Sequence, residues 1–394
     1  MSADGASAGA AVAHLERLVA WPTISSRPVT GLAAWLADRA ASAGFTVDRF
    51  EVDDGKVNLV CRKGPRRDDR TRGLVLSGHM DVVPVDGQDW SSDPFRLTER
   101  GGRLFGRGAA DMKGFIAATV AACDELADVD LTDELVLVWT CDEEVGCRGS
   151  ADLVAKLQRD PGDPLPRPTI IGEPTDFRVC RLHPGHATWQ VSCHGRPAHS
   201  SRPTLGLSAI KLATRVLLEL EALEDELRSD RRFEGDLPSP WPVLNTALIS
   251  GGAAVNIVPD HCVVTLGVRP LPGQEAAEIG ARLAERVEAL DRAARADGGR
   301  VKLDALQDTP SLLTPADCGH LHLLAPHASH PHPTGAPFAT DGGQLARLGC
   351  EPLVFGPGSI DVAHRPDEYL ERGELLATVG MIADVVRRAC APTR

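Results

Sequence analysis

The chain has 394 residues, of which 43% are hydrophobic and 25% charged, and its formal net charge is -13. This length exceeds the size at which a single hydrophobic core usually stops growing, so we expect two domains. The acidic balance leaves no basic stripe that could neutralise phosphates, which excludes a nucleic-acid partner and disfavours an anionic membrane surface.

The segment 1–21 lacks a basic leader and an uninterrupted apolar core, so it predicts neither a secretory signal nor a membrane span. Ten cysteines are scattered through the chain without a Cys-x-x-Cys pair. A chain of this length does not need disulfides to stabilise its core, so we interpret them as buried thiols in a reducing compartment, the cytoplasm.

Short apolar runs alternate with helical patterns between residues 10 and 180, as in a helix-covered sheet. Four runs are too short for helices and rich in β-branched residues, so they predict buried strands at 57–61, 73–78, 134–140 and 168–173. The segment 111–126 has helical spacing. This part of the chain is therefore predicted to be an α/β domain with a mixed sheet.

The pattern changes near residue 185, where alternating strands at 187–195, 245–251, 262–268 and 301–306 enclose two long helices. These helices are predicted at 205–227 and 275–295, which completes the β-α-β-β-α-β order of a ferredoxin-like α+β unit. We predict a catalytic domain formed by 1–182 and 308–394, with an inserted lid and dimerisation domain at 183–307. The proline-rich segments 160–168 and 327–337 are expected to be loops, and a last helix begins near Glu374.

Polar residues interrupt the apolar strands of the first domain at their ends. His79 and Asp81 follow the strand at 73–78, and alone they would be a structural histidine and a turn residue. The same event recurs at Asp111, at Glu143 with Glu144, and at Glu173 in the sequences GRGAADMKG, CDEEVG and GEPT. Strand ends are where ligands bind in α/β sheets, and carboxylates gathered there repel one another unless a cation is bound. The sequence therefore predicts a metal site.

The mixture of histidine and carboxylate ligands without cysteine favours catalytic zinc, whereas an oxygen-only set would favour magnesium or calcium. Cobalt and manganese accept similar ligands and stay open as alternatives. His183, His186, His194 and the histidines between 320 and 332 are expected to be surface or loop residues.

Eight motifs together resemble a di-zinc peptidase and deacylase superfamily that includes acetylornithine deacetylase, succinyl-diaminopimelate desuccinylase, aminoacylase and glutamate carboxypeptidase. The resemblance covers nearly the whole chain, and the motifs occur in the family's order. They are SGHMDVVP, WSSDPF, GRGAADMKG, CDEEVG, GEPT, GRPAHSS, GGAAVNIVPD and GPGSIDVAHRPDEY.

The resemblance implies two zinc ions bridged by Asp111. His79 and Glu173 would complete one coordination shell, and Glu144 and His364 the other.

Further roles follow from the same resemblance. Asp81 would orient His79. This role agrees with a general rule, because a metal-ligating histidine usually donates its second ring N–H to an acceptor. Glu143 would be the general base that takes a proton from the attacking water and returns it to the leaving amine.

Three residues of the inserted domain are implied in substrate binding. His199 would reach the substrate carbonyl, often from a partner subunit, Asn256 would make another polar contact, and Arg269 would bind the α-carboxylate. The alternatives are a loop histidine, a turn-forming asparagine and an exposed salt bridge. Asp341 and Gly342, within the segment 341–343, are expected to face the substrate.

The resemblance to the acetylornithine deacetylase branch makes N-acetylornithine the first expected substrate. Another N-acyl-amino-acid deacylase or desuccinylase, or a metallo-carboxypeptidase or dipeptidase, is the alternative, and a non-catalytic binding protein of the same fold is a remote one. We also predict a homodimer formed through the inserted domain, which closes on the substrate as lids do.

Overall fold

A computed structural model describes residues 3–25, 27–53, 55–160, 162, 164–230 and 232–391. The chain forms two compact units: residues Met1–Leu182, Thr314–Ala336 and Thr340–Arg394 make unit 1, and His183–Leu313 with Pro337–Ala339 make unit 2. The sequence predicted the inserted segment at 183–307. Within the described residues, no helix has the length and apolar character needed to cross a membrane.

Unit 1 contains a large mixed sheet, a small antiparallel sheet and seven α-helices among its described residues. Its elements are α1 (Ala3–Val19), α2 (Thr30–Ser42), β1 (Thr46–Asp53), β2 (Lys56–Lys63), β3 (Leu74–His79), β4 (Thr98–Arg100), β5 (Arg103–Phe105), α3 (Lys113–Glu125), β6 (Leu135–Thr140), α4 (Arg148–Arg159), β7 (Pro168–Ile171), β8 (Cys180–His183), α7 (Leu321–Leu324), a short 3₁₀ turn (Ala325–His327), β16 (Thr334–Gly335), α8 (Gly342–Ala346), β17 (Glu351–Val354), β18 (Tyr369–Glu371) and α9 (Arg372–Cys390).

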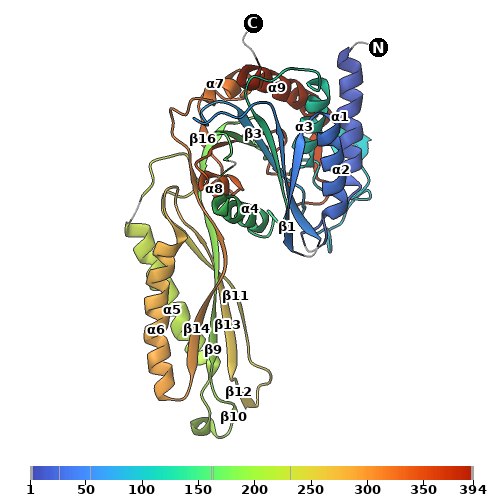
Figure 1. The fold of residues 1–394 in the computed structure, drawn as a ribbon. Coiled ribbons are helices and arrows are strands. Elements are labelled where there is room, and N and C mark those ends of the chain that lie inside the picture. The colour runs from blue at the N-terminus through green and yellow to red at the C-terminus, as the bar shows by residue number, and fades with distance from the viewer. Residues whose placement is uncertain are drawn as a thin grey trace. The chain divides into compact units, whose positions relative to one another are not determined.

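The large sheet has the order β1-β2-β6-β3-β7-β17-β8, with β6, β3, β7 and β17 parallel. Every residue of β3, β6 and β7 is buried, as expected of parallel strands covered on both faces. Helices α1, α2, α3 and α9 pack together on one face, and α4 and α8 contact each other and the sheet on the other (Figure 1). This arrangement confirms the predicted helix-covered mixed sheet.

Unit 2 contains a four-stranded antiparallel sheet with two long helices and a separate two-stranded sheet formed by β10 and β12. Its elements are β9 (His186–His194), β10 (Ala198–His199), a 3₁₀ turn (Pro203–Leu205), α5 (Ala209–Asp230), β11 (Val243–Gly251), β12 (Ile257–Val258), β13 (His261–Arg269), α6 (Ala276–Ala296) and β14 (Arg300–Thr309), followed by β15 (Leu312–Leu313).

The four main strands of unit 2 have the order β11-β13-β9-β14, with every pair antiparallel. Burial alternates along β9 and β13, so one face of the sheet packs against α5 and α6 (Figure 1). The chain order β9-α5-β11-β13-α6-β14 is the predicted ferredoxin-like one.

The structure corrects the prediction for His183, which is the last residue of β8 and fully buried, so it is neither a surface nor a loop residue. His320, directly before α7, is a loop residue as predicted, although it is buried. The residues next to a histidine in the sequence do not predict its burial, because the burial results from the packing of segments that are distant in the sequence.

Candidate metal centre

The predicted metal ligands of unit 1 meet where parallel strands end. His79 is the last residue of β3, Glu143 and Glu144 follow β6, and Glu173 follows β7. Strands β6, β3 and β7 are adjacent and parallel, so their carboxyl ends share one edge of the sheet. Asp111 stands just before α3, in the loop facing that edge.

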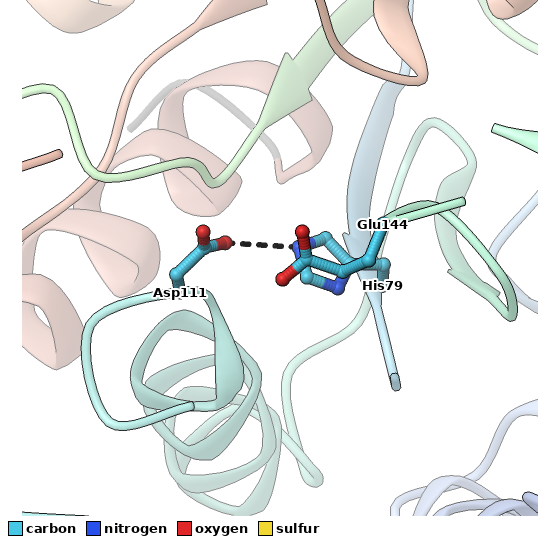
Figure 2. A group of neighbouring side chains, drawn as sticks. All are labelled: His79, Asp111 and Glu144. Carbon is cyan, nitrogen blue, oxygen red and sulfur yellow. Dashed lines mark hydrogen bonds and ion pairs between the residues drawn. The ribbon is translucent and has the colours of Figure 1, made fainter. Parts of the chain in front are cut away.

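Asp111 lies between two histidines. Its Oδ1 is 3.0 Å from His79 Nε2, and its Oδ2 is 3.2 Å from His364 Nε2. His364 Nε2 is also 3.0 Å from Glu144 Oε2. The side chains of His79, Asp111 and Glu144 point toward one another (Figure 2), and their ligand atoms lie within 4.8 Å of one another. A carboxylate with one oxygen toward each histidine is suited to bridge two cations.

A second group shares His79 with the first. Ligand atoms of His79, Glu143 and Glu173 also lie within 4.8 Å of one another, and His79 Nε2 is 3.8 Å from Glu173 Oε1. The structure therefore brings together all six side chains that the sequence predicted as ligands or base, including His364 from a distant segment.

The acidic side chains in this cluster have perturbed pKa values. Burial raises the pKa of Glu143 and Glu173 well above the usual range, and burial together with the Asp111 charge raises that of Glu144 to about 7. Burial alone would also raise the pKa of Asp111, but hydrogen bonds with the two histidines lower it. Buried carboxylates at this density need compensating positive charge, and the N/O donor set fits divalent zinc.

Asp81 supports the cluster with two different groups. Its backbone carbonyl accepts a hydrogen bond from His79 Nδ1 at 2.9 Å, whereas its carboxylate is 3.8 Å from that nitrogen. The carboxylate accepts from the backbone N–H groups of Glu143 at 3.1 Å and Glu144 at 3.3 Å, and from the Ser25 hydroxyl at 2.8 Å. Asp81 thus fixes the histidine through its backbone and the turn with both glutamates through its side chain.

Glu368 is a supporting residue that sequence reasoning missed. Its fully buried carboxylate accepts from the backbone N–H groups of Ala110 at 2.9 Å and Asp111 at 3.1 Å, and from Arg107 Nη1 at 2.6 Å. It therefore holds the loop that presents Asp111. The available signal was its place in HRPDEY, four residues after His364.

Asp341 lies beside the predicted base. It is buried at the start of α8, accepts from the hydroxyls of Thr140 and Ser150 at 2.5 Å each, and forms a close group with Glu143 and Cys147. Cys147 Sγ is 3.4 Å from Glu143 Oε1. Gly342 is buried in the first turn of α8. Neither Asp341 nor Gly342 is exposed, and sequence reasoning did not single out Cys147.

The three predicted substrate residues of unit 2 separate into two places. His199 in β10 pairs with Ile257 in β12, directly after Asn256, and both predicted residues are exposed. Arg269 is the last residue of β13. The first residue of β13, His261, pairs with His194 near the end of unit 2 that contains β10 and β12. At about 3.3 Å per residue, the length of β13 separates the two places by roughly 25 Å.

Arg269 is half-buried and has no ion-pair or hydrogen-bond partner among the described residues. Burial lowers the pKa of its guanidinium group. An exposed salt bridge, the alternative for this residue, is therefore not what the structure contains.

Known proteins resemble this chain over nearly its whole length. Residues 75–388 match the model of peptidase family M20/M25/M40. The chain is 36% identical over 382 residues to an acetylornithine deacetylase of Myxococcus xanthus, covering 96% of this chain and 97% of that protein. It is 35% identical over 356 residues to an acetylornithine deacetylase of Vibrio vulnificus, covering 90% of each.

Solved structures show the same fold at low sequence identity. An M20 family metallo-carboxypeptidase of Sulfolobus solfataricus superposes with a TM-score of 0.77 at 16% identity, over 96% of this chain and 98% of that one. A dinuclear metal-binding M20 peptidase of Bacillus subtilis superposes with a TM-score of 0.66 at 13% identity, over 97% and 98%.

Proposed function

Since the chain belongs to peptidase family M20/M25/M40, we propose that it hydrolyses the amide bond of an N-acyl amino acid, with N-acetylornithine as the first substrate. The observation that carries this proposal is the buried cluster in which Glu143 stands beside His79 and Glu173. Two relatives that share about a third of their sequence with nearly the whole chain are acetylornithine deacetylases, which favours that substrate.

The cluster would hold two zinc ions, with cobalt or manganese as substitutes. Asp111 would contribute to both sites, because its two carboxylate oxygens face different histidines. His79 and Glu173 would complete one site, and Glu144 and His364 the other. The bound ions would polarise the substrate carbonyl and lower the pKa of the attacking water.

Glu143 would take the proton of the attacking water. Its carboxyl group lies beside His79 and Glu173, where the bound cations would favour the ionised form that accepts a proton. The same group would then protonate the leaving amine. The Asp81 carboxylate would keep this base in place through the backbone N–H of Glu143.

Arg269 would bind the substrate carboxylate, because a half-buried guanidinium group without a partner in the described part of the chain is a ready donor of two parallel hydrogen bonds. His199 and Asn256 would contact the substrate near its carbonyl. His199 and Asn256 lie at one end of unit 2, and Arg269 lies at the other. A single copy of unit 2 therefore cannot bring both places into contact with one small substrate. His199 would therefore come from a second copy of the chain.

A homodimer through unit 2 is accordingly part of the proposal. Strand β11 is an edge strand, and Leu248 and Ile249 on it are 67% and 55% exposed. An apolar edge strand pairs readily with another chain. We also propose the cytoplasm as the compartment, because all ten cysteines are buried free thiols.

The test is acetate release from N-acetylornithine by the zinc-loaded protein, with N-succinyl-diaminopimelate and a set of dipeptides assayed in parallel. We expect the highest kcat/KM with N-acetylornithine. Turnover of only the other amides would remove the named substrate and keep the reaction class, and turnover of none of them would contradict the hydrolase proposal.

A further inference from the structure

His186 and Arg269 lie directly opposite each other on two neighbouring strands of unit 2. Ala187 pairs with Val268 in the register of β9 and β13. Two steps farther along the two strands, the N–H of Gly185 donates to the carbonyl of the residue after Arg269 at 2.9 Å. His186 and Arg269 form the pair between these two, and the Cα atoms of such a pair are about 4.5 to 5.5 Å apart. Their side chains therefore leave the backbone next to each other.

Both side chains lie on the face of the sheet turned away from α5 and α6. Burial alternates along β9 and β13, and the neighbouring Ala187 and Val268 belong to the core beneath these helices. His186 and Arg269 point to the other face and are each partly buried. Within the part of the chain that the structure describes, Arg269 has no ion-pair or hydrogen-bond partner. Its guanidinium fork thus keeps its hydrogen-bonding capacity for a ligand.

Gln307 determines which ring nitrogen of His186 carries the proton. Gln307 Nε2 donates to His186 Nδ1 at 3.3 Å and to the Thr309 hydroxyl oxygen at 3.4 Å. An amide nitrogen can only donate, so Nδ1 accepts and the proton of the neutral ring is on Nε2. Burial and the Arg269 charge lower the pKa of His186 to about 4, so the ring is neutral at pH 7. His186 therefore presents a fixed Nε2–H donor beside the guanidinium group.

The space beside this donor is open because Gly267 has no side chain. Gly267 lies on the same face as Arg269, two residues before it on β13. A Cβ atom at Gly267 would be 3.6 Å from His186 Nε2, and no other atom of the described residues outside the adjoining chain lies within 4 Å of that position. Nε2 itself makes no hydrogen bond with the described residues. A ligand atom thus has room to approach Nε2.

We propose that His186 is a second donor to the substrate carboxylate and so a specificity-determining residue of the hydrolase. The Arg269 fork binds the two carboxylate oxygens, and His186 Nε2–H donates to a lone pair that Arg269 leaves free, since a carboxylate offers about four. A carboxamide in the same place would set its own N–H groups against these donors, which disfavours it. This role rests on the proposed function, because it requires a substrate with a free carboxylate.

Steady-state kinetics of two His186 variants tests this role, on the carboxylate-bearing amide with the highest kcat/KM and on its carboxamide. His186→Phe keeps an aromatic ring but removes the donor, so KM for the acid should rise about tenfold while kcat changes less than about threefold. His186→Gln places an amide N–H near the position of Nε2 and should restore KM to within about threefold of wild type. The carboxamide should not distinguish His186→Phe from wild type. His322→Phe, the same change on an exposed histidine of α7, is the control.

A ring that only packs in the sheet would give a different pattern. An equal rise of KM on the acid and the carboxamide, no recovery in His186→Gln, or an unchanged KM in His186→Phe would each overturn the inference and leave the hydrolase proposal intact. A wild-type protein that hydrolyses none of the amides contradicts the proposed function instead. In that case calorimetric titration of the zinc-loaded protein with N-acetylornithine and its carboxamide makes the same comparison. Equal affinity of wild type and His186→Phe for N-acetylornithine, or no binding of it by wild type, would then overturn the role of His186.

Discussion

Histidines in two regions of this molecule have pKa values that are shifted in opposite directions. At the metal edge of unit 1, burial alone would lower the pKa of His79, but Asp111 and the nearby glutamates raise it well above the usual value. Hydrogen bonds with Asp111 and Glu144 raise the pKa of His364 to about 10. Beside Arg269, burial and the guanidinium charge instead lower the pKa of His186 to about 4.

The histidine pKa shifts thus indicate electrostatic fields of opposite sign in the two regions. A histidine surrounded by carboxylates indicates a place where a cation is needed, and one beside an unpaired guanidinium group indicates a place suited to an anion. In the proposed reaction an N-acyl amino acid would meet both needs, because its amide carbonyl would bind at the cations and its carboxylate at Arg269.

The largest expected effect is at the proposed base. Glu143→Gln keeps the size of the side chain but removes the proton acceptor, so kcat should fall by at least about 10³-fold while bound zinc is retained. Steady-state kinetics and elemental analysis of the same sample measure both quantities. Glu125→Gln, an exposed change at the end of α3, should leave kcat unchanged. A Glu143→Gln enzyme within tenfold of wild type would exclude Glu143 as the base.

The second-largest effect is expected on zinc affinity, through the loop that carries Asp111. Glu368→Gln weakens the acceptor that holds the backbone of Ala110 and Asp111, so zinc affinity should fall about tenfold to a hundredfold. Competition with a chelator measures this affinity. The matched control is Glu371→Gln, which loses only the half-exposed ion pair with Arg103. Unchanged zinc affinity in Glu368→Gln would mean that the loop holds Asp111 without this carboxylate.

A smaller effect is expected in the anion-binding region. Arg269→Met retains the apolar stem and removes the fork, so KM for N-acyl amino acids should rise about tenfold with kcat changed less. Amidated substrates that lack the carboxylate should not distinguish the variant from wild type. Arg215→Met, an exposed change on α5, is the control. An equal loss on both kinds of substrate would assign Arg269 a structural role.

Site residues that follow a local sequence pattern could be predicted, whereas contacts between segments far apart in the chain could not. His79, Glu143, Glu144 and Glu173 could be found because each follows a strand whose apolar run is visible locally. His364 could not, because its contact with Asp111 joins segments far apart in the chain, and only the family resemblance indicated it.

Supporting contacts were harder to predict than ligands. The Asp81 carboxylate binds the backbone of the Glu143–Glu144 turn, and such a backbone contact leaves no pattern in the side-chain letters. The predicted ferredoxin-like order of unit 2 is correct because its alternation and helical periods are local, but burial of His183 depends on tertiary packing. Periodicity predicts elements, and it does not predict which polar side chains they enclose.

The smallest expected effect is on the acid stability of unit 2, and it follows from the lowered pKa of His186. The unfolded chain binds this proton near pH 6.5 and the folded chain only near pH 4, so the native state loses stability as the pH falls through that interval. Arg269→Met removes the repulsion but not the burial, which is the larger cause. The variant should therefore lose slightly less stability than wild type between pH 6.5 and 4, measured as urea midpoints across pH with Arg215→Met as control. A loss in Arg269→Met as large as that of wild type would show that the Arg269 charge does not act on His186.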